Sequence, residues 1–428
     1  MINGLIKRLL RYPAVRAMAK KIYAEFRLGE GNENLPELGS LSARPSDLCG
    51  SRINLLVPAV SAQYVFGGVA TALALFERLR GQFAESRIIV TDEWSITLMT
   101  SLVRGNWQFL SMDDNDATGN TIITCGDRSR SSIPIRGGDI FVATAWWTAY
   151  AGFSLLEWQT QYYGIKQPRL AYLIQDFEPG FYPWSSRYAL ADLTYRYPDK
   201  TIGIFNTHLL ADFFSANNIA FPVSFTFEPK MDGTLLRLRE SRATFRKTRT
   251  LLFYGRPSVE RNAYALAIGG LRFWAAHYSQ AHKWRVLSVG EAHSPVALTE
   301  NLNLVSLGKL SLSEYADLLC ATAVGLSLMI SPHPSYPPLE LAAFGAKVIT
   351  NRYANKDLSS LSASIYSVQR ADYKSIGEAL AMACNEYDSE RAPWEVPVNK
   401  VHLSGEFLVP GDPFAFAPQL AEVLLGVL

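Results

Sequence analysis

Short apolar runs alternate with longer segments of helix-like spacing from residue 52 onward. A first series of runs predicts strands over residues 53–58, 87–91, 121–125, 139–144, 170–175 and 201–205. A second series predicts strands over residues 250–254, 285–289, 304–307, 325–330, 347–350 and 364–368. Runs that are apolar throughout and separated by helices are typical of parallel strands covered on both faces. The pattern therefore predicts an α/β protein with two doubly wound domains that face a cleft.

A polar stretch rich in arginine, residues 229–249, separates the two series of strands. We expect a basic N-terminal helix and linker over residues 1–50, an N-terminal domain over 51–230, a C-terminal domain over 231–400, and a C-terminal segment over 401–428 that packs back toward the N-terminal domain. Residues 29–50 are rich in Gly, Pro, Ser and Asn, which favour loops. The folded part is therefore expected to begin at Arg52.

The first 30 residues carry seven basic side chains and two acidic ones. Apolar residues recur between them at near-helical spacing, from Leu5 to Phe26, although Pro13 interrupts the pattern. Such a segment suits either an anionic membrane surface or the body of the protein, with its basic face in water. Peripheral membrane contact and a packed helix therefore both remain open.

Composition narrows the class of protein. Of the 428 residues 48% are hydrophobic and only 19% are charged, which excludes disordered, collagen-like and coiled-coil chains. A formal charge of +2 is too balanced for nucleic acid as the main partner. The four cysteines lie far apart, with neither metal-knuckle nor disulfide spacing, so a reducing, cytoplasmic compartment is expected. The uncharged stretches 140–156 and 318–339 are too short or too rich in proline to span a membrane.

Glycines and arginines stand where strands of such sheets end, which is where open parallel sheets bind ligands. Gly67 and Gly68 follow the first predicted strand and open a helix, whose free N–H groups would face an anion. In the second series, Gly255 and Arg256 follow strand 250–254, and Arg261 comes shortly after. Two guanidinium groups suit a diphosphate, because each engages two oxygens and neither loses its charge.

The strand predicted over 325–330 ends in a proline-rich turn, followed by a helix through residues 341–345. Glu340 is expected in the first turn of this helix, where its carboxylate would accept a hydrogen bond from a ribose hydroxyl. Free N–H groups near Leu339 would face a phosphate. The remaining candidates for nucleotide contact are Ser335 and Tyr336 in the turn and Gly308 after strand 304–307.

Two sets of residues resemble a known family. The Gly255-Arg256 turn with Arg261, the serine and proline turn before Glu340, and residues 345–349 look like the donor half of a GT-B glycosyltransferase of family four. Residues 172–184 resemble the rhamnosyltransferase branch, which builds rhamnose-containing surface polysaccharides. The chain departs from the family in three places. Pro332 stands where the family has the first of two glutamates, and Arg261 replaces a lysine. Gln175, Asp176 and Glu178 stand where many relatives carry a catalytic-site histidine.

The resemblance implies two Rossmann-like domains and transfer of a sugar, most simply L-rhamnose from dTDP-L-rhamnose, onto a growing polysaccharide or glycolipid. It also implies retention of configuration and no metal or other cofactor, because arginines and helix termini stabilise the leaving diphosphate. Asp176 or Glu178 would assist deprotonation of the acceptor, and Arg256 and Arg261 would neutralise the leaving group. The aromatic residues of segment 172–184 would form either a sugar-stacking platform or core; they are Tyr172, Phe177, Phe181, Tyr182 and Trp184.

Other functions compete with this interpretation. Asp114 and Asp116 form an acid-x-acid pair of the kind that holds Mg²⁺ or Mn²⁺ in glycosyltransferases of the other major fold. A catalytically silent sugar-binding or scaffold protein would keep the same fold, and Pro332 in place of a glutamate favours it. A nucleotide-sugar epimerase is a further alternative. The sequence also leaves GDP and UDP open beside dTDP.

Overall fold

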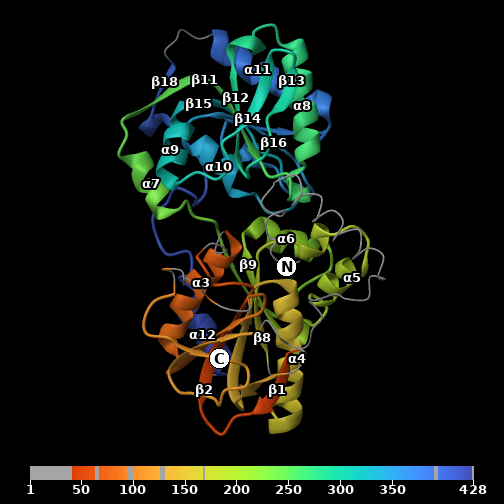
Figure 1. Cartoon of the computed structure of the whole chain (residues 1–428), viewed down its shortest axis with the longest axis vertical. Coiled ribbons are helices and arrows are strands. Elements are labelled where there is room, and N and C mark those ends of the chain that lie inside the picture. The colour runs from red at the N-terminus through yellow and green to blue at the C-terminus, as the bar shows by residue number, and fades with distance from the viewer. Residues whose placement is uncertain are drawn as a thin grey trace, which may run out of the picture.

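The computed structural model describes residues 41–62, 67–93, 96, 101, 103–125, 131–166, 169–389 and 394–426. Within them, two sheets covered by helices form two lobes stacked end to end (Figure 1). The N-terminal lobe lies below in this view and the C-terminal lobe above. The predicted basic helix in the first 30 residues lies outside the described residues.

The N-terminal lobe is built on an eight-stranded sheet in which every paired strand is parallel. In spatial order its strands are β10 (Val223–Phe227), β9 (Thr201–Asn206), β8 (Leu170–Ile174), β7 (Gly138–Ala143), β2 (Ser51–Val57), β3 (Glu85–Val90), β5 (Asn120–Thr124) and β4 (Gln108–Leu110). The helices of this lobe are α3 (Gly68–Leu79), α4 (Trp146–Tyr163), α5 (Ser186–Leu193) and α6 (His208–Ala216).

The C-terminal lobe holds a second, mostly parallel sheet. In spatial order its strands are β13 (Val296–Thr299), β14 (Leu302–Ser306), β12 (Arg285–Gly290), β11 (Thr244–Gly255), β15 (Thr322–Leu326), β16 (Lys347–Asn351) and β17 (Ile365–Val368), with β18 (Trp394–Pro397) antiparallel to the start of β11. Its helices are α7 (Gly233–Glu240), α8 (Tyr264–His277), α9 (Leu312–Ala321), α10 (Tyr336–Ala343) and α11 (Tyr373–Ser389).

The central strands hold runs of consecutive apolar residues because both of their faces are buried. Leu55 in β2 packs into the cluster that contains Phe76 of α3, whereas the next residue, Leu56, packs into the cluster with Leu155 of α4. The second sheet repeats the arrangement, and Leu251 and Leu252 of β11 enter opposite clusters. Side chains alternate along a strand, so a sheet covered by helices on both faces needs apolar residues at every position. The predicted fold class is confirmed.

Several local predictions were wrong. Ser42–Pro45 lies in the predicted linker but forms strand β1, parallel to β6 (Ser132–Ile135), so the fold begins before Arg52. The polar stretch 229–249, expected only to separate the two series of strands, contains α7 and the first residues of β11. The strand expected over 325–330 is β15 and ends at Leu326. The pattern also missed short strands at sheet edges, where few apolar positions repeat; these are β4, β6, β10, β13 and β18.

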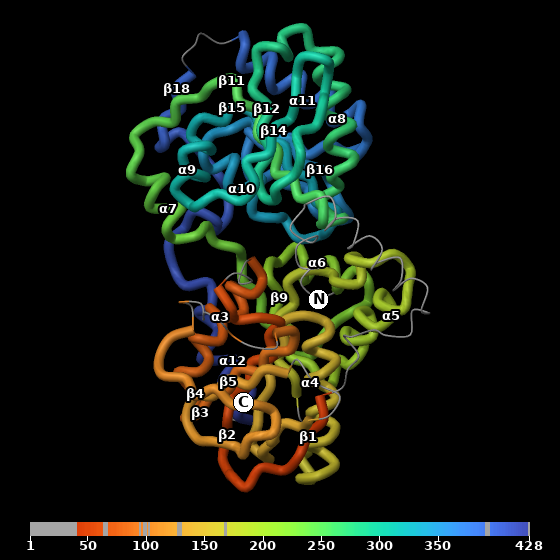
Figure 2. The backbone as a smooth tube through the Cα atoms, viewed as in Figure 1, coloured from red at the N-terminus to blue at the C-terminus, as the bar shows by residue number. Residues whose placement is uncertain are grey.

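Within the described residues, the chain crosses between the lobes twice. It first rises between Phe227, in an N-terminal core cluster, and Met231, in a C-terminal one. It returns between Phe407 and Phe414 and ends in α12 (Ala417–Leu425), which packs on α3 in the N-terminal lobe (Figure 2). The two crossings lie side by side, because Met231 N–H donates to the carbonyl oxygen of Phe407 at 2.9 Å.

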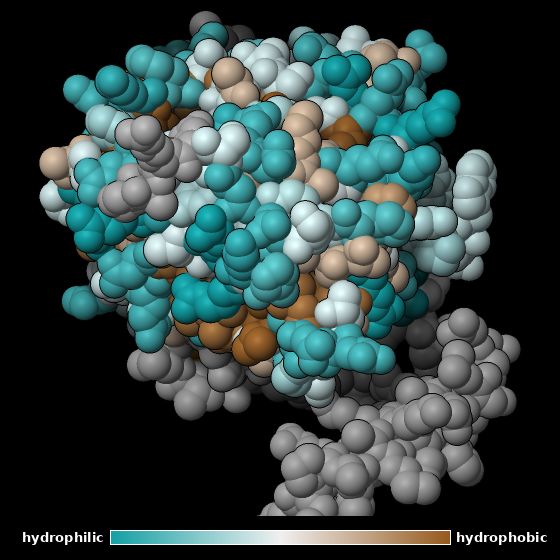
Figure 3. Space-filling view, turned by 90° about the horizontal axis from the view of Figure 1, so that it is seen from above, coloured by the Kyte–Doolittle hydropathy of each residue, from teal (hydrophilic) through white to brown (hydrophobic). Residues whose placement is uncertain are grey.

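The surface of the C-terminal lobe, seen end on, is largely hydrophilic, with apolar residues confined to small areas (Figure 3). None of the helices in the described ranges combines the length and the apolar character that crossing a bilayer requires.

Candidate functional site

A cleft of about 850 Å³ lies between the lobes, with walls from both. Nine of the predicted site residues line it: Gly67, Gly68, Asp176, Glu178, Arg256, Arg261, Ser335, Tyr336 and Glu340. Candidates more than 250 positions apart in the sequence therefore share one space. This is the arrangement expected when the carboxyl ends of two parallel sheets face each other.

Three predicted residues do not line the cleft. The Leu339 side chain is buried in the core of the C-terminal lobe. Gly255 lies inside β11, where an added Cβ would come within 2.5 Å of Ser288 Oγ, so its role is close packing of neighbouring strands. Gly308 has a φ of +66° in a turn against Ala292. For Gly255 and Gly308, backbone geometry explains the glycine without a ligand.

Arg261 meets Asp176 across the cleft, with 3.6 Å between Nε and Oδ2. Its guanidinium also lies 4.2 Å from the ring centre of Phe181, a cation–π contact. The turn that carries Arg261 is fixed from within its own lobe, because the Ile330 N–H donates to the carbonyl oxygen of Arg261 at 2.7 Å. One guanidinium is thus held over a ring and a carboxylate of the opposite lobe.

Asp176 binds the C-terminal lobe through a second contact. Its Oδ1 accepts a hydrogen bond from the Ser331 hydroxyl and another from the N–H of Phe177 at 2.8 Å. The side chain is only 7% exposed. Asp176 is therefore a buried carboxylate at the junction of the lobes with two partners from the donor half.

Glu178 has a different environment. Its Oε2 accepts a hydrogen bond from the backbone N–H of Trp146, at the start of α4, and lies 3.4 Å from the hydroxyl of Tyr172. Burial raises the pKa of Glu178 to about 8, although the Trp146 hydrogen bond favours the charged form. At neutral pH the side chain is mainly a neutral acid inside the N-terminal lobe.

Glu340 lies in the second turn of α10, not the first, because the helix begins at Tyr336. The Tyr315 hydroxyl donates to its Oε2 at 2.9 Å, and burial raises the pKa of Glu340 to about 7. Two of the first three helical positions are Pro337 and Pro338, which have no N–H. Few N–H groups are therefore left to face a phosphate, and positive charge in the cleft comes mainly from side chains.

On the opposite wall, α3 begins at Gly68, as predicted. The preceding Gly67 has a φ of +42°, a left-handed conformation that favours glycine, and no side chain in the described part of the chain caps this helix. An added Cβ at Gly68 would lie 3.0 Å from Oε1 of Gln175. The helix start is thus open toward the cleft, with Gln175 packed beside it.

Most aromatic residues of segment 172–184 belong to the core. Tyr172 is fully buried, Phe177 packs against Tyr195, and Tyr182 accepts a hydrogen bond from the indole of Trp146. Phe181 lines the cleft beneath Arg261. Trp184 is 92% exposed and stacks on Tyr188 of α5, with 5.3 Å between ring centres. The platform interpretation therefore survives only for Phe181 and Trp184.

Asp116 of the acid-x-acid pair belongs to an ion-pair network rather than a metal site, and the Asp114 carboxylate accepts from the backbone N–H of Ser111 at 2.7 Å. Asp116 accepts from Arg52 at 2.6 Å and from Arg136 at 2.7 Å. Burial opposes its ionisation, but the two arginines outweigh burial and lower the pKa of Asp116 to about 2. Among the described residues, no group of three or more His, Cys, Asp or Glu side chains is placed to hold a metal.

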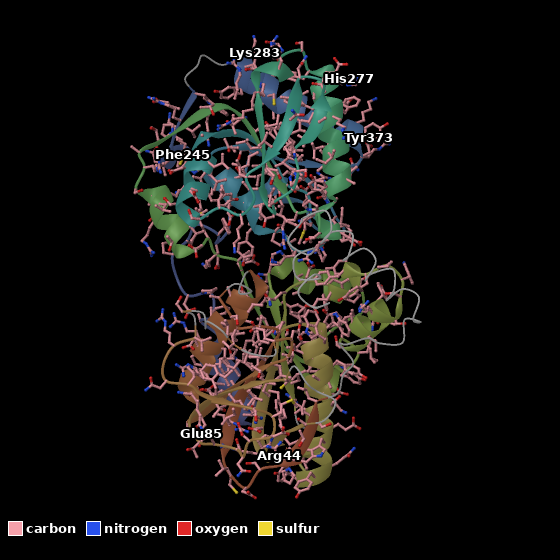
Figure 4. All side chains as sticks on the ribbon, in the orientation of Figure 1. Arg44, Glu85, Phe245, His277, Lys283 and Tyr373 are labelled. Atoms are coloured by element: carbon pink, nitrogen blue, oxygen red, sulfur yellow. The ribbon has the colours of Figure 1, made fainter. Side chains whose placement is uncertain are left out.

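The network also lies far from the cleft. Arg136 pairs with Glu85 at 2.7 Å, and Arg44 donates to the backbone carbonyl of Asp114. Figure 4 shows Glu85 and Arg44 at the end of the N-terminal lobe that points away from the C-terminal lobe. The metal-dependent alternative through Asp114 and Asp116 is therefore wrong on position as well as on partners.

Several cleft residues were not singled out from the sequence. Trp147 is the second residue of α4, the helix that follows β7, and Tyr315 contacts Glu340 from α9. His333 lies in the proline-rich turn and is 6% exposed. The signal for Trp147 was its place after a strand end; for Tyr315 and His333 the sequence gives no comparable sign, because their roles depend on contacts between distant segments.

Comparison with known proteins agrees with this architecture. A family model described as the WsaF N-terminal domain matches residues 52–208, and one described as the WsaF C-terminal domain matches residues 249–381. Over 216 residues the chain is 33% identical to the O-antigen biosynthesis protein RfbC of Myxococcus xanthus. That match covers 50% of this chain and only 15% of RfbC.

Solved structures show the same fold. Sucrose-phosphate synthase from Thermosynechococcus elongatus is 12% identical, with a TM-score of 0.52 over 88% of this chain and 99% of that one. The apo structure of OtsA is 10% identical, with a TM-score of 0.52 over 87% of this chain and 99% of that one. The chain therefore belongs to the WsaF family and has the GT-B fold.

Proposed function

We propose that this protein transfers L-rhamnose from dTDP-L-rhamnose onto a growing surface polysaccharide or glycolipid, without a metal and with retention of configuration. The observation that carries the proposal is the shared cleft, in which Arg256 and Arg261 stand on the donor side and Asp176 on the acceptor side. The donor sugar rests on the resemblance of residues 172–184 to rhamnosyltransferases, and the acceptor class on the similarity to RfbC.

On the donor side, the two guanidinium groups would bind the diphosphate. They keep their charge throughout the reaction and would stabilise the negative charge that grows on the leaving dTDP. Glu340 would accept hydrogen bonds from the ribose, held in place by the Tyr315 hydroxyl. The sugar would then lie toward Asp176, at the opposite wall.

On the acceptor side, Asp176 is a better candidate than Glu178 for receiving the acceptor's proton. Asp176 contacts the donor half through Arg261 and Ser331, whereas Glu178 is mainly protonated at neutral pH and bonded to the backbone of α4. A group that already holds a proton is a poor base. Phe181 and the exposed Trp184 would contact the rings of the acceptor glycan.

The experiment is incubation with dTDP-L-rhamnose, with and without a glycan acceptor, followed by measurement of released dTDP and of the sugar. Acceptor-dependent release of dTDP supports transfer. An altered nucleotide sugar without release indicates an epimerase, and binding without either change indicates a scaffold. A thermal-shift panel of dTDP, UDP and GDP assigns the nucleotide, because a ligand that binds only the folded state stabilises it.

A further inference from the structure

His333 lies in the turn between β15 and α10, and its ring is held in one orientation. The N–H of Ser335 donates to Nδ1 at 3.0 Å, and the His333 N–H donates to the Ser331 hydroxyl at 3.0 Å. Because Nδ1 accepts a hydrogen bond, the neutral ring carries its proton on Nε2. Burial lowers the pKa of His333 to about 4, so the ring is neutral at pH 7. The side chain therefore presents a neutral N–H donor.

That donor lacks a partner. Nε2 of His333 is buried and has no hydrogen-bond acceptor in the described part of the chain. The residue is only 6% exposed, yet it lines the cleft between the lobes. A buried donor without an acceptor is unfavourable, and such groups in native proteins usually have a specific reason. An oxygen of a ligand bound in the cleft would supply the missing acceptor.

The position of His333 indicates which part of the ligand this is. The Ser331 hydroxyl that accepts from the His333 N–H also donates to Asp176, so the turn is tied directly to the acceptor-side carboxylate. A neutral donor matches a neutral hydroxyl, whereas the diphosphate has the guanidinium groups of Arg256 and Arg261. His333 therefore faces the space between diphosphate and acceptor, where the transferred sugar would lie.

We infer that the Nε2–H of His333 binds a hydroxyl oxygen of the transferred sugar, which makes His333 a specificity-determining residue. The inference rests on the proposed function. His333 would also give the sugar a polar contact at the turn in which Pro332 replaces the family's first glutamate. A proline side chain has no polar atom, and the next residue supplies one.

Two substitutions separate the roles of the ring nitrogens. His333→Asn keeps an acceptor near the position of Nδ1 for the Ser335 N–H but removes the N–H donor at the position of Nε2. His333→Gln keeps an N–H near Nε2 but loses the acceptor. Calorimetric titration should show dTDP-L-rhamnose binding to His333→Asn about tenfold more weakly than to wild type, the loss typical of one hydrogen bond. Binding of dTDP alone should stay within about twofold, and His333→Gln should recover most of the affinity for the sugar nucleotide.

The outcomes are distinct. Equal losses for dTDP and dTDP-L-rhamnose would place the contact on the diphosphate and overturn the inference, as would unchanged affinity in His333→Asn. Wild-type protein that binds none of dTDP, UDP and GDP would overturn the proposed function itself.

Singly deoxygenated analogues of dTDP-L-rhamnose give a second test that uses the folded wild-type protein. One analogue should bind wild type about tenfold more weakly than dTDP-L-rhamnose does. The same analogue should lose no further affinity in His333→Asn, because the contact is already absent from it. If every analogue remains as sensitive to His333→Asn as the parent sugar nucleotide, no hydroxyl is contacted and the inference is wrong.

Discussion

Arg261 and Asp176 face each other across the cleft, with 3.6 Å between Nε and Oδ2, and they belong to different lobes. This pair joins the side chain expected to bind the leaving diphosphate to the carboxylate expected near the acceptor. Each would hold the other in place until substrates arrive. The pair therefore couples the donor and acceptor halves of the site, beside the hydrogen bond from the Ser331 hydroxyl to Asp176.

Arg256→Ala should weaken binding of the nucleotide diphosphate by about 2–5 kcal/mol, the range for truncating one member of a buried charge pair. Arg256 lines the cleft, and its guanidinium would otherwise contact the phosphates. Calorimetric titration with dTDP measures the effect. Arg246→Ala is the matched control, since Arg246 is 73% exposed and pairs with Glu395 of β18 at the opposite end of β11 from Arg256. Normal affinity in Arg256→Ala would refute the assignment.

Asp176→Asn should lower kcat by at least about 100-fold, because general-base assistance typically contributes that much. The amide keeps an oxygen for the Ser331 hydroxyl, so the turn should remain in place. Glu178→Gln is the comparison variant, and it should retain most activity, because its neutral amide resembles the protonated acid that the raised pKa of Glu178 favours, and it keeps an oxygen for the Trp146 N–H. Steady-state kinetics at pH 7 measure both. The reverse ranking would assign the role to Glu178.

The buried Glu178 should make stability depend on pH. Its pKa is raised from 4.5 to about 8 in the folded protein, so the unfolded chain loses this proton first as pH rises. The free energy of unfolding should therefore fall between about pH 4.5 and 8, by an amount on the order of a few kcal/mol from this group. Denaturant titrations at several pH values test it. Glu178→Gln should flatten this part of the profile, and an unchanged slope would contradict the prediction.

Trp184→Ala should raise the KM for the acceptor about three- to tenfold and leave the KM for the donor unchanged, given the usual energy of aromatic contacts. Trp184 is 92% exposed and stacked on Tyr188. Tyr162→Ala is a matched control, because Tyr162 is 57% exposed and stacks on Trp158 of α4. Equal effects of the two substitutions would mean that Trp184 makes no specific contact with the acceptor.

Removal of residues 1–28 should reduce sedimentation with anionic liposomes while activity on a soluble acceptor is kept. The seven basic residues of this segment would attract acidic lipids, and its apolar residues would enter the interface. Sedimentation with neutral liposomes serves as the control. If the shortened protein sediments as the full chain does, the segment has no role at the membrane.

The sequence predicted the larger features because they depend on local pattern. Strands such as β2 and β11 are apolar at consecutive positions, and this is visible without knowing their neighbours. Arg256 and Glu340 could be placed near a ligand because each follows a strand of the second sheet. The general rule for ligands at strand ends therefore carried most of the site prediction.

The rest depended on contacts between distant residues. Asp116 resembles a metal ligand locally, but its partners Arg52 and Arg136 come from other strands and loops. Glu340 was expected one turn too early, because the consecutive prolines hide where α10 begins. His333 stood in the predicted turn, yet only the folded structure shows that its outer nitrogen lacks a partner. Polar groups acquire such roles from their surroundings, which sequence pattern does not describe.

The paired crossings of the chain also fix how the lobes can move. The Met231–Phe407 hydrogen bond and the 2.9 Å ion pair between Lys230 and Glu406 fasten the two crossings together at one edge of the molecule. Two lobes joined at one edge open mainly by hinge rotation about that edge, with little shear between them. Entry and exit of substrates would then follow one hinge axis. Arg261 and Asp176, 3.6 Å apart across the cleft, would separate as the lobes open and pair again when they close.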